Sequence, residues 1–167
     1  MMKKEFVDVV DEKDNVLCSV SRSDMREKNL LHRDVKIFVL NSKGEFFIQK
    51  RSMKKDIYPG YFSFGVAGTV KSGEDYVDTA KRELEEEIGF KDADLKFVFK
   101  FKYETRSTKV ISSVFSCVFD GKVKLQKSEV DEGFFVGLSD AKKLMKTKKF
   151  TPDGIFAFNK FLKGYKR

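Results

Sequence analysis

Alternating apolar and polar positions divide the N-terminal part of the chain into short extended segments. β-branched and aromatic residues cluster over residues 6–10, 16–20, 35–40 and 45–49, and such runs between turn-forming residues predict strands. The first two runs are joined by a polar segment, and the last two by Asn41-Ser42-Lys43-Gly44, where Gly44 suits a tight turn. We therefore predict two hairpins, separated by a short helix over 24–28 that Ser23 would cap.

One segment in the middle of the chain has a clear helical period. Apolar residues recur at three- and four-residue steps over 75–88, and Gly89 follows where a helix commonly ends in a left-handed residue. Before it, residues 62–70 have an extended pattern that contains Gly65 and Gly68. Glycines inside a strand usually mark a bulge or a close approach of the backbone to another group.

The remaining pattern predicts strands over 95–103, 110–119 and 134–137, followed by two helices near the C-terminus. The first helix covers about 139–147, and Thr151-Pro152 begins the second, which runs to about 162. Strands first, one helix among them and helices at the end predict a mixed α/β/α sandwich with helices on the sheet faces. No repeat or linker divides residues 1–167, so we expect one domain.

Composition and charge limit the classes of partner. The chain carries a net charge of +8, but its lysines are spread along the whole length, which disfavours a nucleic-acid partner. The start, Met1-Met2-Lys3-Lys4-Glu5, is polar, and no apolar run is long enough to span a bilayer. Cys18 and Cys117 lack metal-type spacing, so we expect buried free thiols and a cytoplasmic protein.

Candidate chemistry is concentrated on the predicted helix over 75–88. Glu83, Glu86 and Glu87 stand at i, i+3 and i+4, so they project from one side of the helix. Such a cluster is tolerated on a fully solvated face, or where cations neutralise it. Clustered carboxylates are also what Mg²⁺ prefers.

The spacing around these glutamates resembles the Nudix box, G-x5-E-x7-R-E-U-x-E-E-x-G-U. Gly68, Glu74 and the run 82–90, Arg-Glu-Leu-Glu-Glu-Glu-Ile-Gly-Phe, match every constrained position. The chain is therefore identified as a member of the Nudix superfamily. The resemblance implies an α/β/α sandwich with a mixed sheet, in which a loop-helix-loop segment at 68–90 carries the catalytic site.

The resemblance also implies roles for individual residues. The Gly68 carbonyl and the carboxylates of Glu83, Glu86 and Glu87 would bind Mg²⁺, or Mn²⁺ in its place, for attack of water on a diphosphate. Arg82 would pair with Glu74 and orient the catalytic glutamates. The general base would be Glu83 or a carboxylate outside the box, for which the candidates are Glu104, Glu129 and Glu132.

A second set of residues resembles the isopentenyl-diphosphate isomerase branch of the superfamily. The matching segments are Leu31-His32-Arg33, Gln49-Lys50-Arg51, Lys55 and Tyr58-Pro59-Gly60. In that branch, cations at the positions of Arg51 and Lys55 grip the substrate diphosphate; the plain alternative is two surface cations. Ala67 and Thr69 stand where the isomerase has its catalytic Cys and a His, so isomerase activity is disfavoured. His32 is then expected to be a hydrogen-bonded structural residue.

The leading hypothesis is a Mg²⁺-dependent hydrolase of a diphosphate linkage in a nucleoside-diphosphate-type or related organic compound. The alternatives are an isopentenyl-diphosphate isomerase and a non-catalytic module that binds a nucleotide or RNA. The residues leave open the substrate, the general base, the number of metal ions, and whether the protein is a monomer or a homodimer.

Overall fold

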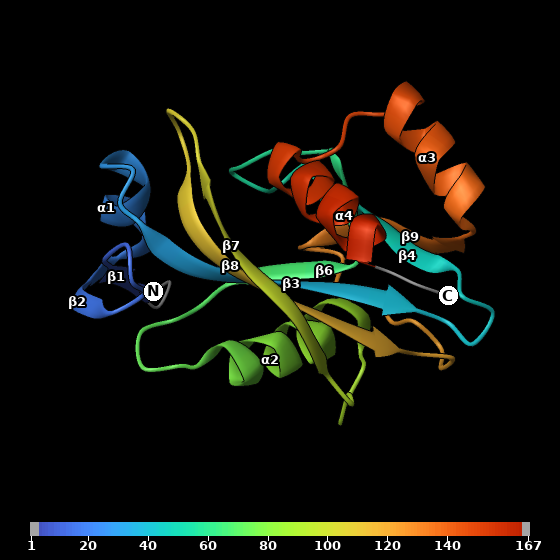
Figure 1. Ribbon diagram of the computed structural model, residues 1–167, viewed down its shortest axis with the longest axis horizontal. Coiled ribbons are helices and arrows are strands. Elements are labelled where there is room, and N and C mark those ends of the chain that lie inside the picture. The colour runs from blue at the N-terminus through green and yellow to red at the C-terminus, as the bar shows by residue number, and fades with distance from the viewer. Residues whose placement is uncertain (1–3, 165–167) are drawn as a thin grey trace.

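A mixed sheet runs through the centre of the computed structural model, with helices on both of its faces (Figure 1). The structure describes residues 4–164; Met1 to Lys3, part of the polar start, and residues 165–167 lie outside the described residues. The elements in chain order are β1 (Phe6–Val10), β2 (Val16–Ser21), α1 (Arg22–Glu27), β3 (His32–Leu40), β4 (Phe46–Arg51), β5 (Phe62–Phe64), β6 (Val66–Thr69), α2 (Tyr76–Ile88), β7 (Lys96–Glu104), β8 (Lys109–Val118), β9 (Val130–Val136), α3 (Leu138–Thr147) and α4 (Pro152–Gly164).

Strand β3 is the centre of the sheet because both of its edges are occupied. One edge pairs in parallel with β8 along the whole strand, and the other pairs antiparallel with β6 over Asp34–Ile37. Strand β4 meets β3 only at Leu40 and Phe46, and pairs instead with β5 and β9. The predicted hairpin of residues 35–49 is therefore wrong beyond its turn, since β6 takes the edge that β4 would need.

The predicted extended segment 62–70 is divided into β5 and β6 at Gly65. This residue has φ +64°, and a Cβ there would lie 1.8 Å from the carbonyl oxygen of Ile37. Only glycine permits both the left-handed backbone and this approach. Gly65 therefore lets the chain pair with β4 through β5 and then with β3 through β6.

Helix α2 covers one face of the sheet. It begins after Asp75, whose side chain accepts a hydrogen bond from the backbone N–H of Asp78 at 2.8 Å, and it ends at Gly89 with φ +74°. Ala80, Leu84 and Ile88 are fully buried against the apolar residues of β3, β6 and β8. The helix is as predicted.

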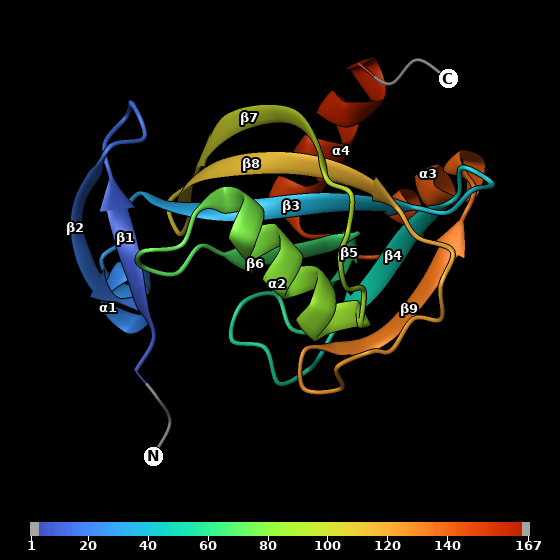
Figure 2. The same ribbon diagram turned by 90° about the horizontal axis from the view of Figure 1, so that it is seen from below.

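Helices α3 and α4 cover the opposite face, as two perpendicular views show (Figures 1 and 2). The core under α4 is rich in phenylalanine: the rings of Phe64 and Phe158 stack with centroids 3.7 Å apart, and Phe38 and Phe46 pack around them. With α2 on one face and these helices on the other, the predicted α/β/α sandwich with a mixed sheet is confirmed.

The N-terminal hairpin forms a separate two-stranded sheet beside α1, at one end of the molecule (Figure 2). Helix α1 starts earlier than predicted and is capped by Ser21 instead of Ser23, since the Ser21 hydroxyl accepts from the Asp24 N–H at 3.1 Å. Cys117 is buried as predicted, but Cys18 is exposed because β2 pairs only with β1. Strand β9 begins four residues before the predicted strand.

No helix among the described residues 4–164 is long and apolar enough to cross a bilayer.

Replacing Gly65 with alanine should destabilise the fold by about 2–5 kcal/mol, since the new methyl group meets backbone atoms in a left-handed residue. Gly44→Ala is the matched control: Gly44 also has positive φ, +74°, but a Cβ there meets nothing within 4 Å. It should cost only about 1 kcal/mol. Urea unfolding of both variants measures the difference, and equal losses would contradict the role given to Gly65.

Candidate functional site

A cavity of about 400 Å³ opens where the two parts of the sheet separate. Residues of α1, β3, the loop after β4, α2, Tyr103 of β7 and the first turn of α4 line it. Strand β6 contributes Ala67, Gly68 and Thr69. Side chains from both faces of the sheet therefore reach the same space.

Gly68 brings α2 close to β6. A Cβ at Gly68 would lie 2.1 Å from the carboxyl carbon of Glu83 and 2.2 Å from its Oε1. The Glu83 side chain is buried and packs directly over the glycine backbone. The glycine expected from the sequence pattern is thus required by the position of a carboxylate.

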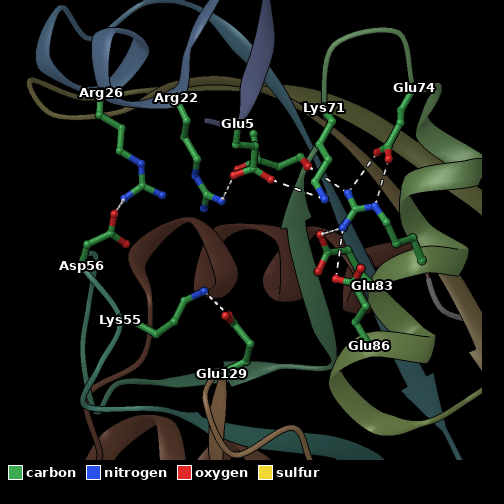
Figure 3. Close-up of polar contacts among 12 residues, drawn as sticks. Glu5, Arg22, Arg26, Lys55, Asp56, Lys71, Glu74, Glu83, Glu86 and Glu129 are labelled. Carbon is green, nitrogen blue, oxygen red and sulfur yellow. Dashed lines mark hydrogen bonds and ion pairs between the residues drawn. The ribbon is translucent and has the colours of Figure 1, made fainter. Parts of the chain in front are cut away.

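Arg82 holds the acidic residues of the α2 region together. Figure 3 shows Glu74, Glu83 and Glu86 converging on one guanidinium. Its Nε and Nη2 donate to the two carboxylate oxygens of Glu74 at 3.0 and 2.9 Å, which is the expected ion pair. Its Nη1 donates to Glu83 at 2.7 Å and to Glu86 at 3.3 Å. Two parallel hydrogen bonds to one carboxylate fix the guanidinium plane, and this in turn orients Glu83.

Glu87 is the most deeply buried carboxylate of the set. Its Oε2 accepts a hydrogen bond from the Gln49 amide at 2.8 Å. Burial and the nearby charge of Glu83 raise the pKa of Glu87 to about 8, although Gln49 opposes the shift. Burial also raises the pKa of Glu83, against the opposing effect of Arg82. Several carboxylates therefore crowd this part of the cavity, and the raised pKa values of Glu83 and Glu87 show that their ionised forms are unfavourable without a further cation.

The donor atoms here fit a hard divalent cation. Glu83, Glu86 and Glu87 present carboxylate oxygens on one helix face beside the Gly68 backbone, and oxygen donors are what Mg²⁺ takes. Across residues 4–164 no three acidic, His or Cys side chains already form a metal cage, because Arg82 holds two of these carboxylates and Gln49 holds the third. Gln49 donates to Glu87 through its amide nitrogen. Its amide oxygen, Oε1, is buried and has no hydrogen-bond partner among the described residues.

Arg51 is the cavity cation that has no carboxylate partner within the described residues. Its Nε and Nη2 both donate to the backbone oxygen of Ile57, at 3.1 and 2.8 Å. Burial lowers the pKa of Arg51, while the charges of Glu87 and Asp153 act in the opposite direction. A buried guanidinium between these two acids can accept an anionic ligand without first breaking an ion pair.

Lys55 and Glu129 form an ion pair at the cavity wall (Figure 3). The other two acids proposed outside the box lie elsewhere. Glu132 of β9 is exposed and pairs with Lys50 of β4, and Glu104 pairs with the surface residues Lys102 and Lys109. Neither lines the cavity. Of the three candidates for a general base, the structure places only Glu129 with the α2 carboxylates.

His32 lies at the cavity wall and is hydrogen bonded, as expected. Its Nδ1 is 3.0 Å from the backbone oxygen of Leu30, and burial lowers its pKa.

The sequence pattern did not reveal a buried ion triad on the other side of the cavity. Lys36 of β3 donates to Asp34 at 2.9 Å and to Asp153 of α4 at 2.6 Å. Asp34 and Lys36 alternate along β3, but nothing in the sequence links them to an acid 117 positions later. The hydrogen bond from Gln49 to Glu87 was not predicted either, because the two residues are 38 positions apart in the sequence.

Comparison with known proteins agrees with this geometry. Residues 30–156 match the model of the NUDIX domain family. An uncharacterized Nudix hydrolase of Pseudomonas aeruginosa is 36% identical over 158 residues, covering 95% of this chain and 94% of the relative. The uncharacterized Nudix hydrolase YfcD of Escherichia coli is 33% identical over 159 residues, covering 95% and 87%.

Solved structures share the fold. A Deinococcus radiodurans protein superposes with a TM-score of 0.78 at 23% identity, covering 89% of this chain and 94% of its own. The MutT protein of Methanosarcina mazei gives a TM-score of 0.68 at 25% identity, covering 82% and 96%. The matched family, the similar relatives and the acidic helix beside Gly68 lead to one conclusion: the chain belongs to the Nudix hydrolases, enzymes that act on pyrophosphate bonds.

Proposed function

We propose that this protein is a Mg²⁺-dependent hydrolase, with Mn²⁺ as an alternative ion, of a diphosphate linkage in a nucleoside-diphosphate-type or related organic compound. The observation that carries the proposal is the presence in one cavity of the α2 carboxylates and of Arg51 without an acidic partner among the described residues. The first can hold a divalent cation and the second a phosphate. A diphosphate needs both.

The Gly68 carbonyl and the carboxylates of Glu83, Glu86 and Glu87 are the proposed metal-holding groups. The bound ion would supply positive charge against the phosphoryl oxygens and acidify water. Glu86 is half exposed, so its side chain is free to adjust, whereas Glu83 and Glu87 are buried and held by Arg82 and Gln49. The site is thus partly organised by the chain itself.

Arg51 and Lys55 are proposed to hold the diphosphate. A guanidinium offers paired N–H groups to phosphate oxygens, and an ammonium offers a mobile point charge. Lys55 pairs with Glu129. A phosphate that competes for Lys55 would release the Glu129 carboxylate.

Glu129 is the proton acceptor that the geometry favours, with Glu83 as the alternative. The water oxygen forms a new bond to phosphorus, the bridging P–O bond breaks, and the water proton passes to the carboxylate. Glu129 lines the cavity opposite α2 (Figure 3), while the oxygen of Glu83 nearest Arg82 is held by it at 2.7 Å. A carboxylate released from Lys55 on substrate binding is free to take that proton.

Residues at the cavity wall argue against the isomerase alternative. Ala67 and Thr69 occupy the positions expected for a thiol and an imidazole, and both line the cavity. Neither side chain can supply the proton transfers that the isomerase draws from its Cys. We propose that this chain shares with that branch its fold and the two diphosphate-binding cations Arg51 and Lys55, but not the isomerase reaction.

We expect metal-dependent release of phosphate or phosphate ester from one member of a substrate panel. The panel holds nucleoside triphosphates, ADP-ribose, dinucleoside polyphosphates, NADH, CoA, and isopentenyl and dimethylallyl diphosphates, assayed with Mg²⁺ and with Mn²⁺. Phosphatase or pyrophosphatase coupling detects the product, and EDTA should abolish it. Turnover that persists in EDTA would refute the metal dependence.

Replacing Glu86 or Glu87 with glutamine should reduce kcat by at least about 100-fold, because a metal-holding charge is lost while the side chain keeps its shape. Glu85→Gln is the matched control on the same helix, since Glu85 is exposed and does not line the cavity. Thermal unfolding should show that all three variants fold. Near-normal turnover of both Glu86→Gln and Glu87→Gln would remove the metal assignment.

Replacing Arg51 with methionine should raise KM for the diphosphate substrate about 10–100-fold, the cost of losing a charged hydrogen bond. Lys54→Met is the control, since Lys54 is an exposed cation three residues away that does not line the cavity. Steady-state kinetics of the two variants decides. An equal, small change in both would show that Arg51 is an ordinary buried cation.

A further inference from the structure

The side of the cavity next to α4 has no role in the chemistry proposed for α2. It contains the ion triad of Asp34, Lys36 and Asp153, which we call the polar floor, with Tyr58 and Tyr103 beside it. The Lys36 side chain is only 7% exposed, and those of Asp34 and Asp153 are 14% and 20% exposed. Two carboxylates share one ammonium at this wall, and burial raises the pKa of Asp34 although the charge of Lys36 opposes the shift.

Such a triad is costly to bury. Removing three charges from water is repaid only when their geometry and remaining hydrogen bonds are good, and apolar residues of similar size are often as stable. Apolar residues occur on the same side of the sheet, since Phe38 of β3 and Phe64, which also lines the cavity, belong to the phenylalanine-rich core. Because the triad lines a cavity, its polar groups can form hydrogen bonds with a bound ligand.

Strand geometry places the floor at the far end of the proposed diphosphate site. Along β3, Val35 and Ile37 point to the α2 side, while Asp34 and Lys36 point to the α4 side. Arg51 lines the same cavity as Glu87 of α2 and Asp153 of α4. A diphosphate held by Arg51 would then extend its organic half toward Asp153.

The remaining lining of the cavity is mixed. Tyr58, Tyr103, Thr69 and Thr108 line the same cavity as Asp153. The aliphatic or phenyl side chains that line it are Met25, Ile57, Phe64 and Ala67. Met25 and Phe64 are at least 96% buried, so these two side chains offer little surface to a ligand, and apolar contacts come from Ile57, Ala67 and the tyrosine rings.

We propose that the polar floor is a specificity site that selects a substrate whose organic half donates hydrogen bonds, as the sugar hydroxyls and base of a nucleoside do, and rejects a prenyl chain. Asp153 is the principal acceptor, Lys36 holds it in place, and the two tyrosines offer rings against which a planar group can stack. This inference rests on the proposed function, because it assigns the second half of the same substrate.

Measuring the equilibrium dissociation constants of ligands that are not hydrolysed tests the specificity site separately from catalysis. Isothermal titration calorimetry in EDTA would compare AMP, CMP, GMP and UMP with isopentenyl monophosphate, which carries the same phosphate without the donors. We expect at least one nucleotide to bind at least about 10-fold tighter than isopentenyl monophosphate, since paired polar groups discriminate strongly against an analogue that lacks them. Isopentenyl monophosphate binding as tightly as every nucleotide, or no binding of any nucleotide, would overturn the proposal.

Asp153→Asn is the first variant, with Asp140→Asn as its matched control. Both residues are aspartates in the first turn of a C-terminal helix, but Asp140 faces solvent. Asp153→Asn should weaken binding of the preferred nucleotide about 10-fold and leave isopentenyl monophosphate unchanged, whereas Asp140→Asn should change neither. Equal behaviour of the two variants would assign the triad a purely structural role.

A triple variant with Asp34→Leu, Lys36→Met and Asp153→Leu guards against misfolding. Because buried ion triads can be replaced by apolar residues without loss of the fold, this protein should remain folded and should now favour isopentenyl monophosphate. Unaltered nucleotide preference in the folded triple variant would refute the specificity role. The panel assay of hydrolysis reports on the proposed function alone, so the failure of either proposal is visible without the other.

Discussion

The occupation of both edges of β3 is the constraint on which the rest of the structure depends. Strand β8 takes one edge and β6 the other, so β4 must turn away after the hairpin and build its own pairs with β5 and β9. Gly65 allows this division, because the chain changes direction there against the backbone of Ile37. The cavity is the space left where the two sets of strands separate.

Among the described residues, the lysines and arginines that line this cavity have carboxylate partners, with one exception. Arg82, Lys55 and Lys36 each have carboxylate partners, whereas Arg51 has only a backbone oxygen in the part of the chain that is described. A buried cation with spare donors and a cluster of acids with excess charge are each unfavourable alone. A diphosphate that carries a divalent cation would satisfy both, so the electrostatic cost of burying these groups is consistent with the proposed chemistry.

Local patterns were enough to predict the parts of the fold that depend on neighbours in sequence. Helix α2, its end at Gly89 and the strands β7 and β8 follow from residue spacing and turn-forming residues. The acidic face and its pairing with Glu74 could be anticipated because the residues concerned lie within one loop and one helix. The requirement for glycine at 68 also has a local signal, although its reason, the close approach of Glu83, lies in tertiary packing.

Competition for a strand edge is not visible in local patterns, which is why the turn and the first pair of the β3–β4 hairpin were predicted correctly but its continued pairing was not. The same limit applied to the acids outside the box. Glu104, Glu129 and Glu132 look alike as sequence, and only the path of the chain brings Glu129 beside Lys55 while leaving the other two on the surface. Contacts between distant segments decide which of several similar residues is available for chemistry.

The alternation of side chains along β3 links the two ends of the site. Val35 and Ile37 pack toward α2, and Asp34 and Lys36 face α4 from the same strand. A shift of β3 by one residue would reverse both faces and bury charges against the α2 core. The apolar packing that seats the carboxylate helix therefore also determines where the polar floor lies. The chemistry proposed for one end of the cavity and the recognition proposed for the other would therefore be positioned by one strand, and a substrate that spans them would contact two sets of residues with a fixed separation.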